Sequence, residues 1–141
     1  TEAYLSKVNT LKNELKKSIL IRQVSASTHV PGQSIEYSIS KIRTEGQDEN
    51  SGVNMNFIGI DDDYIDTYDL QILAGKNFPE KPNSDQPLII LNESAAQALG
   101  FKNYESAIGQ FVVHHGNKKQ IHGIVNDYHQ QSLKKARRMD K

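Results

Sequence analysis

The residues that decide the fold lie at 88–100 and read LIILNESAAQALG. The apolar run at 88–91 has the length of a short buried strand, and we expect it to lie in the centre of a sheet. Asn92 is a residue type that caps helix N-termini, and Gly100 has the conformational freedom that the position after a helix requires. The pattern therefore predicts a strand followed directly by a helix over 93–99.

A β-hairpin is predicted upstream of this unit. Residues 35–44 alternate apolar and polar side chains, and the parity changes at Ser40-Lys41, which indicates a strand with a bulge. The polar segment 45–52 follows as a loop, and 53–59 resumes the alternation as the return strand.

A second hairpin is predicted downstream. Apolar residues alternate over 111–125 on both sides of Gly116-Asn117, which is a typical hairpin turn. Short strands joined by hairpins, with a few short helices packed on them, indicate the α+β class, with small mixed or antiparallel sheets.

The N-terminal residues 3–18 are predicted to form an amphipathic helix with a narrow apolar stripe that packs on one side. The stripe recurs at spacings of four, three and four residues and consists of Tyr4, Val8, Leu11 and Leu15. A short strand is predicted over 21–27, and a further helix is predicted to begin at 130–135.

The composition excludes several classes of protein. The 17 Lys and Arg residues balance the 17 Asp and Glu residues, so no net charge draws the chain to nucleic acid or anionic lipid. The absence of cysteine excludes disulfides, cysteine zinc sites and a thiol nucleophile. No phosphate-binding loop is present, so any ATPase is a separate domain or subunit. No apolar run approaches the roughly 20 residues that span a bilayer. Because the chain starts at Thr1 rather than methionine, we expect the natural chain to begin earlier.

An acidic run raises the question of calcium binding. An EF-hand loop needs Gly at its sixth position and Glu at its twelfth, whereas a loop starting at Asp61 has Asp66 and Ile72 there. We therefore expect Asp61 or Asp62 to cap a short helix that ends near Tyr68. The other carboxylates of this run are expected to be solvated and are Asp63, Asp66 and Asp69.

The histidines do not form a metal-binding motif. His114 and His115 are adjacent on a predicted strand and are expected to point to opposite faces, while His122 on the facing strand could neighbour one of them. A pair falls short of the three protein ligands of a catalytic zinc site, so no metal is expected, and His29 and His129 stand apart.

No catalytic site is expected either. The chain has no GxSxG motif, and the adjacent residues Asp127, Tyr128 and His129 lack an identifiable nucleophile. We expect Asp127 to end a strand and cap the next segment, and Tyr128 to pack. Phe78 and Phe101 follow glycine-containing loops, where they could form a partner-binding patch, and we favour packing at the edge of the core.

Several segments resemble the MacB-like periplasmic core domain of ABC transporter permeases, the FtsX-like/MacB family. Residues 63–78, DYIDTYDLQILAGKNF, are similar to the family pattern DxxYxxxxGxxLLxGRxF. Residues 121–133, IHGIVNDYHQQSL, are similar to IxGVVxDFHxxSL. The segments 24–27, 30–32, 89–96, 99–100 and 107–109 also fit, in order and at similar spacing.

The resemblance implies an inner-membrane protein with four transmembrane helices, in which this domain is periplasmic and lies between the first two. It implies as partners the transmembrane part of the same permease and a cytoplasmic ABC ATPase. A periplasmic protein or peptide and a second copy of the permease are further partners. It implies no cofactor and no enzymatic activity of its own. The implied function is to couple ATP-driven motion to export of an antibiotic or peptide, to lipoprotein release, or to mechanotransmission.

Within one extracytoplasmic domain over 1–141, the resemblance implies a stalk-like helix at 1–20, an α+β core at 21–129, and a segment at 130–141 that leads toward a membrane span. The chain departs from the family in two ways. Asp69 stands where the family usually has glycine, which puts a positive φ there in question. The resemblance also implies a fold with a porter-like α/β lobe and a smaller β-rich lobe. Family members continue beyond the Ser132-Leu133 segment with a further strand–helix–strand, so the porter-like lobe of this chain is expected to be incomplete.

Two other hypotheses about function stay open at this point. One is a free-standing extracytoplasmic module that binds a ligand or protein through its hairpin loops. The other is a metal-dependent hydrolase that uses the histidines.

Overall fold

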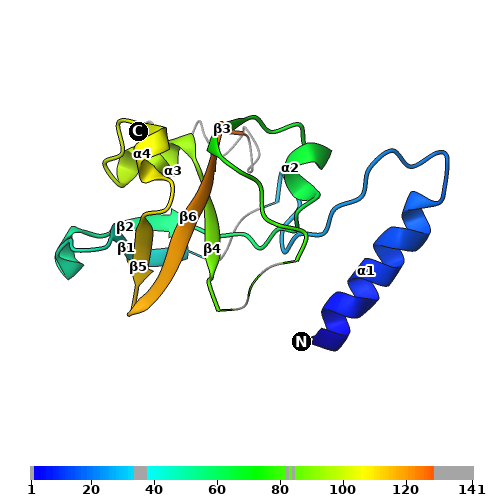
Figure 1. Ribbon diagram of the computed structural model, residues 1–141, viewed down its shortest axis with the longest axis horizontal. Coiled ribbons are helices and arrows are strands. Elements are labelled where there is room, and N and C mark those ends of the chain that lie inside the picture. The colour runs from blue at the N-terminus through cyan, green and yellow to red at the C-terminus, as the bar shows by residue number, and fades with distance from the viewer. Residues whose placement is uncertain (1, 34–37, 82, 84, 129–141) are drawn as a thin grey trace.

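The computed structural model describes residues 2–33, 38–81, 83 and 85–128 (Figure 1). Its helices and strands follow one another as α1 (Glu2–Lys16), β1 (Ser38–Thr44), the 3-10 helix η1 (Glu49–Ser51), β2 (Val53–Asn56), α2 (Tyr64–Thr67), β3 (Ile72–Gly75), β4 (Leu88–Asn92), α3 (Glu93–Ala98), α4 (Tyr104–Ala107), β5 (Phe111–His114) and β6 (Asn117–Val125). This mixture of short strands and short helices confirms the α+β class.

Strand β6 organises the sheet. It pairs antiparallel with β5 and then with β3 along its length, and it pairs in parallel with β4. The full order is β2-β1-β5-β6-β3, with β4 attached to β6. The prediction that the apolar strand β4 is central was wrong, because β6 is its only partner among the described strands. The apolar character of β4 instead reflects a face, with Ile89 and Leu91, that is buried in the core beside α3.

The first hairpin follows the prediction closely. The β1–β2 register shifts between Ile39 and Ile42, and Lys41 takes a positive φ of 58°, so the bulge lies where the parity of the sequence changes. The loop contains η1, which Asp48 caps by accepting a hydrogen bond from the Asn50 amide at 2.7 Å. Strand β2 ends at Asn56, before the predicted end at residue 59.

The predicted strand over 21–27 is wrong. Only an isolated bridge between Ser27 and Ile60 is present there. The amide of Ala26 donates to the carboxylate of Asp61 at 2.7 Å, which replaces a bond to a neighbouring strand. The helix predicted from residue 130 lies outside the described residues.

The helix after β4 is confirmed with both of its ends. The Asn92 side chain accepts from the Ala95 amide, and Gly100 takes a φ of 90° after the last turn. Helices α3 and α4 cover one end of the sheet (Figure 1), where Ala96, Leu99 and Ala107 enter the core. Their partners from the sheet are Ile42, Ala74, Ile89, Leu91, Val112, Ile121 and Ile124.

Within the described ranges, no helix combines the length and the apolar character needed to cross a bilayer.

Candidate functional site: the junction of helix α1 with the core

Helix α1 lies to one side of the sheet, beyond α2 (Figure 1). The apolar stripe is predicted to pack, and Val8 is half-buried, but Tyr4 and Leu11 are 65% and 60% exposed, and Leu15 is also exposed. The prediction was therefore wrong for three of the four residues of the stripe. The helix turns a different side toward the core, where Lys12 is its one buried residue.

Lys12 is held between two carboxylates. Its Nζ lies 2.5 Å from Asp61 Oδ2 and 2.7 Å from Asp63 Oδ2, and Lys12 is only 8% exposed. One turn later, Lys16 Nζ lies 2.9 Å from Asp63 Oδ2. These four residues form what we call the α1 junction, in which two positive charges meet two negative ones.

The α1 junction also holds the chain that follows α1. Asp61 Oδ2 accepts from the amide of Ala26 as well as from Lys12. This engagement explains why the side chain of Asp61 does not cap α2. Asp63 occupies the cap position, and its side chain makes no capping hydrogen bond. The prediction of a cap at Asp61 or Asp62 was therefore wrong.

The charges at the α1 junction shift each other's titration. Burial alone would lower the pKa of Lys12, but its hydrogen bonds to Asp61 and Asp63 outweigh burial and raise the pKa above 10.5. The hydrogen bond from Lys12, followed by that from Lys16, holds the pKa of Asp63 below 3.8. Both partners therefore stay charged over the whole range between these values.

We expect the Asp63 carboxyl to titrate below 3.8, and the substitution Lys12→Met to raise that midpoint. Because folding lowers this pKa, the stability contributed by Asp63 is present above the unfolded-state pKa and is lost as the pH falls through the folded value. The raised pKa of Lys12 contributes stability below 10.5, which is lost as the pH rises through the folded value. NMR titration of the Asp63 side-chain carbon measures the midpoint, and the same midpoint in both chains would contradict the ion pair.

The carboxylates of Asp61, Asp62 and Asp63 can approach within 4.8 Å of one another. The ammonium of Lys12 contacts Asp61 and Asp63, and that of Lys16 contacts Asp63, so the protein itself supplies two positive charges to these three carboxylates. The other acidic residues of the run lie apart from it. Asp66 is exposed within α2, and Asp69 follows that helix with a positive φ of 53°.

The histidines lie differently from the prediction. The rings of His114 and His115 are in contact, with centroids 4.2 Å apart, because His115 takes a φ of 45° in the turn and does not continue the strand. Burial first, and then the charge of His115, lowers the pKa of His114. Residue His114 pairs with Asn117, so His122 is not its neighbour on the facing strand. His29 contacts Thr28, and His129 lies outside the described residues.

Asp127 has a structural role that differs from the prediction. Its carboxylate accepts from the Ser94 amide at 3.0 Å, from the Ser94 hydroxyl at 2.5 Å and from Asn92 Nδ2 at 2.7 Å. It therefore stabilises the start of α3, which precedes it in the chain. Tyr128 packs against Tyr64 with ring centroids 6.5 Å apart, as predicted.

Three solved structures share this architecture. The periplasmic region of MacB from Actinobacillus actinomycetemcomitans matches with a TM-score of 0.57 over 85% of this chain and 50% of that one, at 21% identity. The extracellular domain of the ABC-type transporter YknZ from Gram-positive bacteria matches with a TM-score of 0.58 over 84% and 57%, at 22% identity. The chain has the fold of the MacB-type periplasmic domains. A domain of a protein described as a permease from Porphyromonas gingivalis gives 0.57 over 83% and 49%, at 13% identity.

The similarity to MacB-type domains is one of fold. Neither the protein-family models nor the curated protein sequences match the chain. The chain spans about half the length of the MacB-type structures that it resembles, at 50%, 57% and 49%. Asp69 has a φ of 53°, so the backbone of this chain adopts the left-handed conformation at this position although no glycine is present.

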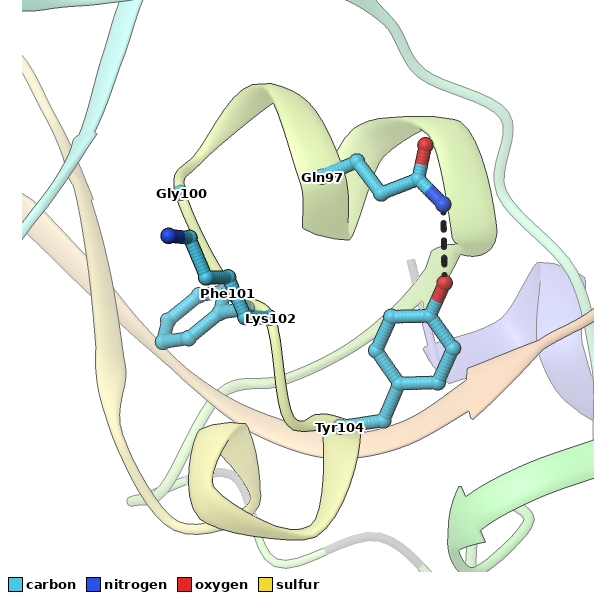
Figure 2. Close-up of a pocket in the computed structure, with 5 residues that line it drawn as sticks. All are labelled: Gln97, Gly100, Phe101, Lys102 and Tyr104. Atoms are coloured by element: carbon cyan, nitrogen blue, oxygen red, sulfur yellow. Dashed lines mark hydrogen bonds between the residues drawn. The ribbon is translucent and has the colours of Figure 1, made fainter.

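The two phenylalanines lie at the edge of the MacB-type core. Phe101 packs against the core cluster, as predicted, and Phe78 is half-buried. Figure 2 shows Phe101 in a pocket of about 330 Å³ whose other lining residues are Gln97, Gly100, Lys102 and Tyr104. The Tyr104 hydroxyl accepts from Gln97 and donates to Glu93, so two polar residues of the pocket lining, Gln97 and Tyr104, bond to each other.

The α1 junction was missed by sequence reasoning. A signal was present, since Lys12 and Lys16 are four residues apart and therefore share one side of a helix. Nothing in the sequence indicated that this side, and not the apolar stripe, would face Asp61 and Asp63.

Proposed function

We propose that this chain is the periplasmic domain of an inner-membrane ABC transporter permease. In this proposal it transmits ATP-driven motion of the transmembrane helices to a periplasmic protein or peptide. Its partners are the membrane part of the same permease, a cytoplasmic ABC ATPase, and a second permease copy. The chain itself makes and breaks no bonds. Export, lipoprotein release and mechanotransmission are the alternative outputs of this motion.

The observation that carries the proposal is the MacB-type fold combined with the way α1 is attached. A helix that serves only the stability of a domain buries its apolar stripe. Here α1 keeps Tyr4 and Leu11 exposed and is fixed to the core through the side chains of Lys12 and Lys16. Such a helix can change its position without opening the core, which suits an element that carries motion.

The proposal predicts that the position of α1 responds to nucleotide in the full-length permease with its ATPase. Spin labels at Asn13→Cys on α1 and Lys102→Cys after α3 report the position of α1 relative to the core. This chain contains no cysteine of its own, and both sites are exposed. We expect the distance measured by pulsed electron paramagnetic resonance to differ between the nucleotide-free protein and the protein trapped with ATP and vanadate.

As a control, a label pair within the core, at Lys102→Cys and Lys119→Cys, should give one distance in both states. If the α1 distance is also the same in both states, α1 does not change its position relative to the core, which contradicts this part of the proposal. If the full reading frame lacks apolar segments of about 20 residues on both sides of this region, the permease assignment fails and a free-standing binding module becomes the better explanation.

A further inference from the structure

We propose that the α1 junction is a releasable ion-pair lock in which Lys12 is the positioning residue that sets how α1 leaves the core. The docked state of α1 is the one that the structure shows, and the released state is part of this proposal. The use of these states in transport rests on the function proposed above.

The core side of the α1 junction is rigid. Asp61 and Asp63 precede Tyr64 and Ile65, which are 0% and 1% exposed. The ring of Tyr64 contacts Tyr68 and Tyr128, with centroids 4.7 and 6.5 Å away. The two carboxylates are therefore fixed to the core, and a displacement of α1 acts on residues that cannot move independently of it.

The α1 side of the junction is held by charge. Lys12 and Lys16 both reach Asp63, and Lys12 also reaches Asp61. The charge of Lys12, which is only 8% exposed, would be unfavourable if it stayed buried without Asp61 and Asp63. The same charge is favourable once it is hydrated by water. Intermediate positions of α1 are therefore disfavoured, and the helix is either docked with its ion pairs formed or released with Lys12 hydrated. Release exposes little apolar surface, because three of the four residues of the apolar stripe are already exposed when α1 is docked.

Asp61 contacts both connections between α1 and the core, which are the side chain of Lys12 and the backbone segment that follows α1. The same oxygen, Oδ2, accepts from Lys12 and from the backbone amide of Ala26. The Asp61 amide in turn donates to the Ala26 carbonyl at 3.1 Å. Loss of Lys12 therefore removes one of the two hydrogen bonds to this oxygen, and the bond from the Ala26 amide has to orient the carboxylate without it.

The test uses the 141-residue chain with spin labels at Asn13→Cys and Lys102→Cys. We expect one narrow distance peak in the parent chain and loss of that peak in Lys12→Met. The matched control is Lys7→Met, which removes an exposed lysine of the same helix and should keep the narrow peak. The variant Lys12→Arg retains the charge and should retain a single peak.

Thermal unfolding followed by circular dichroism separates release of α1 from loss of the fold. Release is supported if Lys12→Met broadens the peak while the core unfolds at the same temperature as in Lys7→Met. A narrow, unshifted peak in Lys12→Met overturns the proposal. A broad peak in Lys12→Arg as well as in Lys12→Met also overturns it, because charge would then not be what holds α1.

In the full-length permease, Lys12→Met should abolish the nucleotide-dependent change in distance and leave ATP hydrolysis in place. If the parent permease shows no such change, the proposed function fails. The distance peaks of the 141-residue chain still decide the role of the α1 junction in that case.

Discussion

The substitution Ile124→Ala is expected to lower the free energy of unfolding by about 2–5 kcal/mol, the range for removal of a large aliphatic side chain from a core. Ile124 is 0% exposed and lies on β6, where it pairs with Leu91 of β4 and with Ala74 of β3. The cavity therefore opens where three strands meet, and the surrounding backbone is held by pairing on both sides and cannot collapse into it.

Urea unfolding followed by far-ultraviolet circular dichroism measures this effect, since the chain contains no tryptophan as a fluorescent probe. The matched control is Ile19→Ala, which removes the same side chain from a position that is 99% exposed. We expect the control to change stability by less than about 0.5 kcal/mol. Equal losses in the two variants would show that Ile124 is not at the centre of the core.

The substitution Gly75→Ala should have a comparable or larger effect, a loss of about 3 kcal/mol or more from backbone strain and overpacking together. Gly75 has a φ of +70°, which disfavours any residue with a Cβ. An added Cβ would also lie inside van der Waals contact with the His122 carbonyl oxygen and 2.8 Å from Ile108 Cδ1. The first of these atoms belongs to the backbone of β6 and cannot move without disturbing the β3–β6 pairing.

The control for this variant is Gly100→Ala. Gly100 has a φ of +90°, but an added Cβ there would have no atom within 4 Å. We expect it to lose only the conformational part of the effect, about 1–2 kcal/mol. The difference between the two denaturation midpoints isolates the contact with β6, and identical midpoints would contradict the close approach of β3 to β6.

Local sequence patterns predicted most of this fold because the relevant signals are short in range. The bulge at Lys41 and the cap at Asn92 each depend on a few neighbouring residues. The second hairpin also forms, and it turns at His115-Gly116, one residue before the predicted Gly116-Asn117. The position of β4 was not predictable in the same way. An apolar run reports burial, and burial against α3 gives the same sequence as burial between two strands.

The failures at the candidate site have one physical origin. The apolar stripe of α1 predicts a side that faces the core, because a packed stripe is what usually stabilises a helix. The ion pairs between Lys12 and Asp61 join residues far apart in the sequence, and charge patterns carry no information about such pairs. His115 is a smaller case, since its positive φ in the turn brought two rings together that a regular strand would separate.

The two lysines of the α1 junction are attached at different heights along the helix, one turn apart. A single peptide segment, such as residues 17–25, resists stretching but allows a helix to swivel. Lys12 reaches Asp61 and Lys16 reaches Asp63, so two successive turns of the helix meet two different residues of the core, which fixes the direction of the helix axis as well. While the ion pairs hold, α1 can therefore pass torque into the core through residues 61–63; once they break, the backbone alone can pass only tension.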